Sequence, residues 1–550
     1  MADDVAQHPE AAGAAVSCWK CGGTGEVKGK RGVRKSCVIC CARKKKDGRH
    51  NDGDDEDDES TRARRRAVHV VVVGAGIGGC AIGLALGRLG FSVTILEKDE
   101  SFAQRKQGYG LTIQQGWGAL RRLGLEPPKM ETPSYSHFAF GSDGRILGYF
   151  GSSFSEWFAS QQDYSAKRNG KFNGQGRFNS HVPRQHLRSM LLEPLSDVGV
   201  KVLWNSKFDR LQTRSDSTEK AVDVVFHGKF ETTPLPNLRE LDEESSMSGQ
   251  PCFAIAADLV VAADGIFSGV RRAIYGAEDH LNYLGCVVVL GIAALRHPLT
   301  HERVCETMDG ETRLYTMPFT SAHDDSFQTD TRLRGQDSIM WQLSFPMQDE
   351  DEAKALCADK TYLMSEALRR CGTWHAPIPT LLQQTDLELL SGHPVYDRPE
   401  LDAADLNAHL GNTNMLGKLA FVGDAAHPMS PFKGQGANQA LVDAAALASE
   451  LCAGDNSTID VPAAVERYHL AMCKRTASKV RGSRAAVALL HEPVPDPEAL
   501  ADLWDAGVSA SSPDALNDAI VAIRGFGHCP HALHSVKIEA SKIQDNKSQS

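Results

Sequence analysis

Residues 68–97, VHVVVVGAGIGGCAIGLALGRLGFSVTILE, decide the fold of this chain. Residues 68–73 are apolar almost throughout, which is typical of a strand buried on both faces of a parallel sheet. Gly74, Gly76 and Gly79 follow with the spacing G-x-G-x-x-G. The first glycine permits a tight turn, the second lets the backbone approach a pyrophosphate, and the third permits close helix–strand packing. The segment therefore predicts a Rossmann-like α/β unit that binds a dinucleotide.

The rest of the segment supports this prediction. After the glycines, apolar residues recur at helical spacing, and the free N–H groups at the start of such a helix suit a phosphate. A second strand, 91–96, then ends at Glu97. A carboxylate at this position can accept hydrogen bonds from the adenosine ribose and would repel a 2′-phosphate. Glu97 is therefore predicted to bind the cofactor.

Two later segments distinguish FAD from NAD. Residues 257–272, ADLVVAADGIFSGVRR, begin with a predicted strand that runs into Asp264, and residues 419–446 begin with another strand that ends at Asp424. In this order, the three segments resemble the fingerprints of the para-hydroxybenzoate-hydroxylase-like group A flavin monooxygenases, which are FAD-dependent aromatic hydroxylases. The resemblance covers about 67–491 and is most specific at these fingerprints.

The resemblance implies further cofactor contacts. Asp424 would hydrogen-bond the ribityl chain of FAD, and Asp264 would help to hold the strand, the pyrophosphate loop and the nicotinamide approach together. The family's Pro-x-x-Gly-x-Gly loop and the helix after it match Gly434, Gly436, Ala437 and Asn438. The family's FAD-contacting arginines match Arg184 and, in a looser register that leaves a solvated side chain as the alternative, Arg105.

The reaction implied by this resemblance uses FAD, NAD(P)H as a transient reductant, and O2. A flavin C4a-hydroperoxide would transfer one oxygen atom to an aromatic or conjugated small molecule. The residues reveal no catalytic side chain, and His427 is interpreted as structural because it lies inside a fingerprint. Two alternatives stay open: a flavin-binding redox sensor or interaction protein, and a non-hydroxylating FAD oxidoreductase. A flavin halogenase is disfavoured because no Trp-x-Trp-x-Ile-Pro segment occurs.

The predicted domain plan is an α/β fold in which the FAD-binding domain is interleaved with a mixed-sheet substrate domain. The FAD-binding domain comprises 67–129, 181–275 and 405–455, and the substrate domain comprises 130–180 and 276–404. Residues 456–535 form a C-terminal helical region with a long helix over 462–490, and 536–550 form a polar tail. Residues 232–250 are predicted to be a surface loop.

The substrate wall is expected to come from residues 283–401, where strands are predicted over 287–294, 312–319 and 338–346. Tyr315, Phe319 and Trp341 are candidates for an aromatic pocket, with core packing as the alternative. Arg313 would either pair with a substrate carboxylate or lie in solvent.

A separate cysteine-rich module occupies residues 1–50. Cys18, Cys21, Cys37 and Cys40 follow the spacing C-x2-C-x15-C-x2-C, which is typical of a closed tetrahedral zinc site. The module resembles a zinc ribbon, which would offer a surface for a protein partner; a disordered leader or a redox pair is the alternative. Its basic residues lack aromatic interleaving, so nucleic-acid binding is not expected, although 43–46 would suit nuclear import. Seven acids in 51–59 and four arginines in 62–66 predict an extended charged linker.

Composition sets the remaining limits. The chain has 550 residues, a net charge of −10 and no apolar run near the 18–20 residues that a bilayer span needs. The first residues lack the pattern of a secretory signal. Of the 14 cysteines, the nine outside the module are scattered along the chain, which favours reduced thiols and an intracellular, cytoplasmic location.

Overall fold

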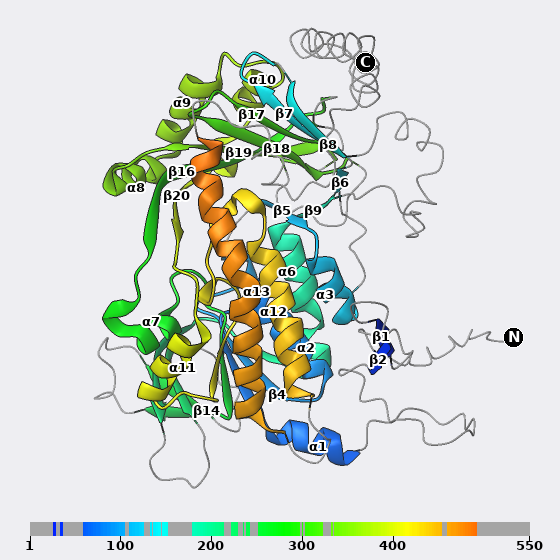
Figure 1. Ribbon diagram of the computed structural model, residues 1–550, viewed down its shortest axis with the longest axis vertical. Coiled ribbons are helices and arrows are strands. Elements are labelled where there is room, and N and C mark those ends of the chain that lie inside the picture. The colour runs from blue at the N-terminus through cyan, green and yellow to red at the C-terminus, as the bar shows by residue number, and fades with distance from the viewer. Residues whose placement is uncertain are drawn as a thin grey trace, which may run out of the picture.

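The computed structural model describes two short strands, 26–28 and 34–36, and most of residues 59–491 (Figure 1). Within the longer span the description omits residues 105–108, 126–131, 135, 145, 152–178, 214–221, 229–234, 236–237, 242–250, 298–299, 301–302, 323–331, 334 and 454–458. Arg105 and the predicted zinc ligands lie outside the described residues, so their roles stay predictions. The two short strands, β1 (Glu26–Lys28) and β2 (Arg34–Ser36), pair antiparallel.

A five-stranded parallel sheet carries the fingerprint segments. Its order is β10-β4-β3-β15-β21, and every neighbouring pair is parallel. The strands span Lys201–Leu203, Ser92–Leu96, His69–Val73, Leu259–Ala262 and Leu419–Phe421, respectively. The β3 strand is buried throughout, as its apolar run predicts. Helices α2 (Ile77–Arg88) and α12 (Gly436–Leu451) pack against each other and join the same hydrophobic core.

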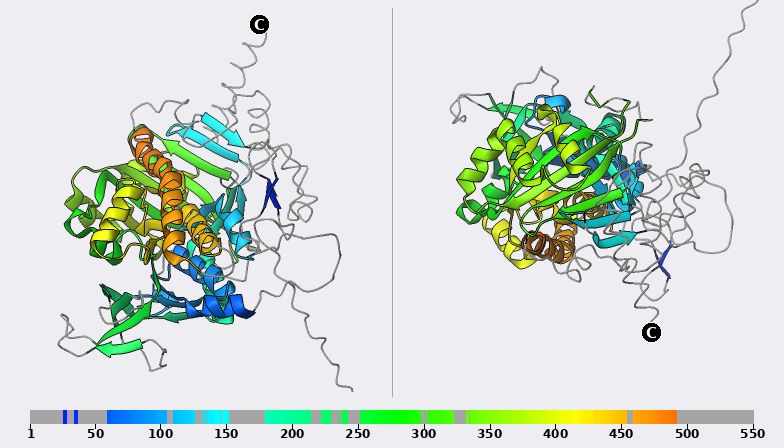
Figure 2. Two further views of the ribbon diagram at one scale, coloured as in Figure 1. Left: turned by 60° about the horizontal axis from the view of Figure 1, so that its bottom comes forward. Right: turned by 90° about the horizontal axis from the view of Figure 1, so that it is seen from above.

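A seven-stranded mixed sheet lies at the other end of the described fold (Figures 1 and 2). Its order is β20-β16-β19-β18-β17-β7-β8, with bounds Ser391–Asp397, Asn282–Ala294, Ser338–Pro346, Arg313–Thr320, Arg303–Met308, Ser136–Gly141 and Ile146–Gly151. Helices α8 (Glu350–Ala358), α9 (Lys360–Cys371) and α10 (Ile378–Gln383) form a hydrophobic core with one face of this sheet. The other face is therefore available to line a site.

Two smaller sheets complete the described strands. One has the order β11-β12-β14-β13 and spans Ser206–Thr213, Val222–Gly228, Cys252–Ala257 and Leu238–Leu241. The other has the order β5-β9-β6 and spans Gly110–Ile113, Asn179–Pro183 and Thr132–Ser134. Helix α3 (Gly116–Arg122) contacts α12, and α6 (Arg184–Leu192) contacts α2. Helix α7 (Gly269–Tyr275) contacts β11, and α11 (Ala403–Asn412) contacts α7 and α13.

The long C-terminal helix is confirmed as α13 (Val461–Leu490). Asp460 caps it by accepting a hydrogen bond from the backbone N–H of Ala463 at 3.0 Å, and Pro462 lies in the first turn, where its missing N–H costs nothing. The helix contacts α12, β21 and β16, so it links the two large sheets.

Two local predictions need correction. The predicted surface loop over 232–250 contains β13, because Leu238–Leu241 pairs along the free edge of β14. The predicted extended linker over 51–66 ends in helix α1 (Glu59–Ala67). In that helix Arg65 is buried and donates a hydrogen bond to the carbonyl oxygen of Leu89 at 3.2 Å, so a tertiary contact overrides the charge pattern.

Among the described helices, none combines the length and hydropathy that crossing a membrane requires.

Candidate functional site

A large cavity of about 1240 Å³, lined by described residues, brings the predicted cofactor residues together with the seven-stranded sheet. Its lining includes these predicted positions: Gly74, Gly76, Glu97, Arg184, Asp264, Asp424, Gly434, Gly436 and Ala437. The cavity also reaches β16, β18, β19 and β20. Gly79 and Asn438 lie behind its wall.

The glycine turn has the backbone constraints that its spacing predicts. Gly74 has φ +102°, and a Cβ there would lie 2.6 Å from the carbonyl oxygen of Ala263. A Cβ on Gly79 would lie 1.8 Å from the carbonyl oxygen of Gly74, so only glycine allows α2 to approach β3 this closely. Gly76 precedes the first residue of α2, and nothing lies within 4 Å of the place where its Cβ would stand. A ligand can therefore approach the backbone at Gly76.

Glu97 is buried beside this turn. One carboxylate oxygen, Oε2, accepts a hydrogen bond from the backbone N–H of Ala75 at 2.8 Å, and Oε1 accepts one from Asp99 N–H at 3.1 Å. The guanidinium of Arg188 lies 3.6 Å from Oε2 and also donates to the carbonyl oxygen of Ala75 at 2.7 Å. Glu97 thus fixes the turn as well as bordering the cavity.

Asp264 lies at the carboxyl end of β15. Its carboxylate accepts hydrogen bonds from the Ser268 hydroxyl at 2.6 Å and the Val270 backbone N–H at 3.2 Å. Burial raises the pKa of Asp264, although these hydrogen bonds act in the opposite direction. Asp264 therefore organises the start of α7 while it lines the cavity.

Asp424 follows the left-handed turn at Gly423, where φ is +65°. Asp424 lines the cavity, and desolvation raises its pKa, opposed by nearby His427 and Arg184. His427 itself is buried with Nε2 at 2.7 Å from Asp443 Oδ2, and the same oxygen accepts from Gly423 N–H at 2.8 Å. Asp443 thus links His427 to the turn at Gly423, which agrees with the interpretation of His427 as a structural residue.

The loop before α12 faces the cavity through Gly434, and the first turn of α12 faces it through Gly436 and Ala437. Gly434 has φ +58°, which closes the turn into the helix. Asn438 is buried, and its side chain binds backbone groups rather than the cavity: Nδ2 donates to Thr112 O and Gly434 O, each at 2.9 Å. The amino end of α12 therefore borders the cavity, and Asn438 fixes the loop there.

Arg184 borders the cavity at the start of α6. Its guanidinium carbon lies 5.4 Å from the centre of the Tyr109 ring, and its backbone N–H donates to Tyr109 O at 3.0 Å. Such a cation–π contact holds the side chain beside the cavity.

The sheet end of the cavity holds a buried charge cluster. The Arg313 guanidinium donates to the Glu306 carboxylate from the neighbouring strand, and their side chains are 2% and 0% exposed. His137 Nε2 lies 3.6 Å from Glu306 Oε2. Burial opposes ionisation of Glu306, but Arg313 and His137 outweigh it and hold the pKa of Glu306 below its usual value. The alternative of Arg313 in solvent is therefore wrong, and its carboxylate partner is internal.

The three aromatic candidates have different surroundings. Tyr315 lines the cavity and, with Phe432, flanks the Arg313 guanidinium. Trp341 is fully buried on the opposite face of the sheet and donates from Nε1 to Thr385 Oγ1 at 2.8 Å. Phe319 is buried in a hydrophobic cluster. Core packing is therefore the correct alternative for Trp341 and Phe319, whereas Tyr315 lines the cavity.

Sequence reasoning missed Glu306, His137 and Phe432. A glutamate inside the strand RVCETM was an available signal, because a carboxylate is almost never buried without a partner. The partner could not be chosen from the sequence, since His137 and Glu306 meet only through the parallel pairing of β7 with β17.

The family described as FAD binding domain (FAD_binding_3) matches residues 67–310 and 382–464. The chain belongs to this FAD-binding family. The predicted dependence on FAD is thereby confirmed at the level of the family.

Curated members with related sequences are named as monooxygenases. "Monooxygenase cfoF" of Aspergillus candidus is 26% identical over 70% of this chain and 82% of its own length. "6-hydroxynicotinate 3-monooxygenase" of Pseudomonas fluorescens is 26% identical over 69% of this chain and 81% of its own length. These names support the predicted class of FAD-dependent monooxygenase.

Solved structures support the fold. Klebsiella pneumoniae HpxO complexed with FAD and uric acid superposes with a TM-score of 0.57 at 19% identity, over 86% of this chain and 98% of HpxO. Pseudomonas aeruginosa PqsL gives a TM-score of 0.55 at 20% identity, over 80% of this chain and 99% of PqsL. The predicted α/β fold with mixed sheets is confirmed.

Proposed function

We propose that this protein is an FAD-dependent monooxygenase that uses NAD(P)H and O2 to hydroxylate an aromatic or conjugated small molecule. One observation carries the proposal: a continuous cavity is lined at one end by the fingerprint turns and at the other by the seven-stranded sheet. The names of the curated relatives, monooxygenases and hydroxylases, point to the same class.

The residues present fit FAD. The open backbone at Gly76, at the amino end of α2, would hold the pyrophosphate, since helix N-termini favour anions. Glu97 would bind the adenosine ribose and Asp424 the ribityl chain. The amino end of α12, at Gly436 and Ala437, would lie against the flavin ring.

Bound FAD would accept a hydride from NAD(P)H and activate O2. The chain itself would bind and orient FAD and the substrate, and it would exclude water from the cavity. The amino end of α12 carries a partial positive charge, which would stabilise negative charge on the reduced ring system. Apolar side chains of the sheet, including Val288, Met317 and Met340, would dry the substrate end. Arg313 would border that end of the cavity with its charge already paired to Glu306.

The reductant is proposed to bind transiently. The sequence contains no second G-x-G-x-x-G segment for a resident nicotinamide domain. The cavity, in contrast, has an exposed aromatic side chain on its border, Phe267, directly after the Asp264 turn. This border offers a planar ring an accessible surface beside the cofactor cavity.

The test is a panel of phenolic and heteroaromatic compounds assayed for stimulation of NAD(P)H oxidation by the purified yellow protein. The true substrate should accelerate flavin reduction, and with ¹⁸O2 its product should gain one labelled atom. Product without label, with all O2 recovered as peroxide, would instead support a non-hydroxylating oxidoreductase. Colourless protein that cannot be reconstituted with FAD would contradict the proposal and favour the interaction or redox-sensor alternative.

A further inference from the structure

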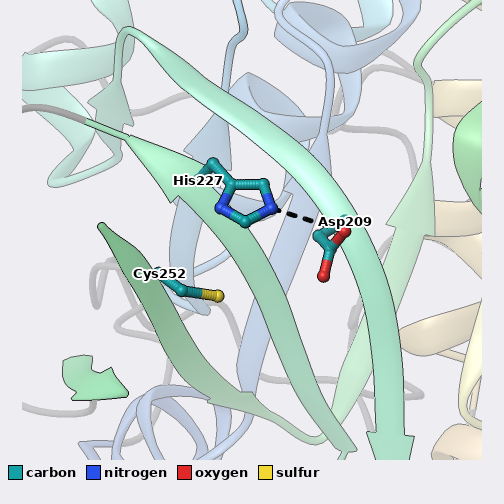
Figure 3. Close-up of side chains that lie close together, drawn as sticks. All are labelled: Asp209, His227 and Cys252. Atoms are coloured by element: carbon teal, nitrogen blue, oxygen red, sulfur yellow. Dashed lines mark ion pairs between the residues drawn. The ribbon is translucent and has the colours of Figure 1, made fainter. Parts of the chain in front are cut away.

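A second group of polar side chains lies on the four-stranded sheet. Asp209, His227 and Cys252 come from β11, β12 and β14, and Figure 3 shows that they converge between the strands. One ligand atom from each residue lies within 4.8 Å of those of the other two. Figure 1 shows β14 at the end of the fold opposite the seven-stranded sheet, so this group is separate from the Arg313 cluster.

The strand register explains why the three side chains meet. His227 lies directly opposite Cys252 in the antiparallel pair β12–β14, so both side chains leave the same face of the sheet. On β11 the register shifts between Phe208 and Arg210, which leaves Asp209 as the extra residue of a β-bulge. A bulge re-aims a side chain, and this one brings the Asp209 carboxylate towards His227.

The two oxygens of Asp209 have different neighbours. Oδ2 accepts a hydrogen bond from Arg210 Nη1 at 2.5 Å, whereas Oδ1 lies 3.5 Å from His227 Nε2. Arg210 therefore holds the carboxylate by one oxygen and leaves the other towards the histidine. Ligating carboxylates in metal sites are commonly oriented by such an outer hydrogen bond.

Burial divides the group in a way that suits an ion. Cys252 is buried, the His227 side chain is 11% exposed, and that of Asp209 is 32% exposed. The site therefore has a sheltered thiol and imidazole at its base and a carboxylate on the side through which an ion would enter.

We propose that Asp209, His227 and Cys252 bind one zinc ion through Oδ1, Nε2 and Sγ. Mixed sulfur, nitrogen and oxygen donors suit zinc, whereas magnesium and calcium prefer oxygen alone. In a tetrahedral zinc site the ligand atoms lie about 3.5 Å apart. The three ligand atoms lie within 4.8 Å of one another, so side-chain movements of about 1 Å would bring them to that spacing. The fourth position would be filled by water.

Zinc binding would join three neighbouring strands through their side chains. Coordination requires the thiolate, so the Cys252 proton would be released to solvent as the metal binds. Since zinc binds the folded sheet and not the separated strands, it would also raise the melting temperature. This inference does not depend on FAD chemistry.

The experiment uses the full chain in which the predicted N-terminal ligands are replaced, because they would add a second metal. The parent protein carries Cys18→Ser, Cys21→Ser, Cys37→Ser and Cys40→Ser, and zinc is added after treatment with a chelator. Metal content is measured by mass spectrometry after dialysis, and melting temperature is measured with and without zinc. Three variants of this parent, Asp209→Asn, His227→Gln and Cys252→Ser, are compared with Cys357→Ser, which replaces a free cysteine outside the group.

The parent and the Cys357→Ser control should retain about one zinc per chain and melt at a higher temperature with zinc. Each of the three variants should lose at least tenfold in zinc affinity and lose the zinc-dependent shift. Cobalt serves as a second probe, because the thiolate-to-cobalt absorption must vanish in Cys252→Ser. Asp209 is exposed, so Asp209→Asn tests the loss of zinc affinity without disturbing a buried residue. A parent without zinc, or equal zinc in the parent and in all three variants, would overturn the assignment.

Discussion

The Asn438 side chain accepts a hydrogen bond through Oδ1 from the backbone N–H of Gln114, at 2.8 Å, although the two residues are far apart in sequence. The same oxygen accepts from Gly116 N–H at 3.0 Å, and Nδ2 donates to two carbonyl oxygens. A single buried amide therefore ties the loop before α3 to the amino end of α12, where the flavin is proposed to lie.

Replacing this amide should destabilise the cavity wall. In Asn438→Asp, a second oxygen would replace the Nδ2 donor and face the carbonyl oxygens of Thr112 and Gly434. We expect a loss of about 1–3 kcal/mol of folding free energy, because buried polar groups lose their partners. Chemical unfolding and FAD content of the purified protein measure the effect. The exposed Asn412→Asp, at the end of α11, is the control; equal losses in both variants would contradict the assignment.

Glu97 should matter for the turn and for FAD together. Glu97→Ala removes the acceptor for Ala75 N–H and leaves buried Arg188 without its carboxylate. A hydrogen bond to a charged group contributes about 1.5–3 kcal/mol, so FAD affinity should fall roughly tenfold or more. Glu97→Gln retains an acceptor, so its FAD affinity should lie between those of the wild type and Glu97→Ala. Flavin fluorescence on dilution measures release, and exposed Glu100→Ala should behave like the wild type.

These residues show how far the sequence could predict the site. Gly74, Gly79 and Glu97 were predictable because a short segment contains both the turn and its constraint. The resemblance puts Asn438 at the start of a helix, and the structure has it in the first turn of α12, but the partners of its side chain belong to a distant segment. Its contacts to Thr112 and Gln114 arise only from packing of α12 on the loop before α3.

The substrate sheet was less predictable for a geometric reason. Strand positions follow from composition, but alternation gives two faces without saying which one faces a site. Trp341 and Gln342 are adjacent, yet Gln342 borders the cavity and Trp341 packs on the helical side. The register shift between Pro318 and Thr320 further breaks the simple alternation along β18, next to Phe319.

The ion pair between Arg313 and Glu306 should show strong coupling. Arg313→Met leaves a fully buried carboxylate without its cation, which costs about 3–5 kcal/mol. The double variant Arg313→Met with Glu306→Gln removes both charges and should be less destabilised than the sum of the single variants. Thermal unfolding of the four proteins forms the mutant cycle. Arg121→Met, at an exposed position in the last turn of α3, controls for the loss of an arginine; strict additivity at 313 and 306 would disprove the coupling.

The same pair predicts a pH dependence. The pKa of Glu306 is lowered in the folded protein, since Arg313 and His137 outweigh the effect of burial. The ionised pair therefore stabilises the fold above the unfolded pKa of about 4.3, and the stabilisation is lost as the pH falls below that value towards the folded pKa. The melting temperature of Glu306→Gln should lie below that of the wild type at pH 7, and the gap should narrow at acid pH. If the difference in melting temperature widened on acidification, the stabilisation could not come from a Glu306 carboxylate with a lowered pKa.

The cysteine module is predicted to be independent of the flavin site, and helix α1 determines where that test must cut the chain. Cys18, Cys21, Cys37 and Cys40 are expected to bind one zinc as a closed structural site, so Cys37→Ser should lower the zinc content by one and leave FAD content and NAD(P)H oxidation nearly unchanged. A truncated chain should begin before Glu59, because the buried Arg65 of α1 donates to Leu89 O beside the first Rossmann strands. Metal content, flavin absorbance and oxidation rate are measured for both proteins.

A second truncated chain, beginning at Ala67, is the matched comparison. It should be less stable by about 0.5–1.5 kcal/mol through the lost hydrogen bond, whereas the longer truncation, the chain that begins before Glu59, should not. A severalfold loss of FAD or activity in the longer truncation, or in Cys37→Ser, would mean that the module packs on the catalytic fold.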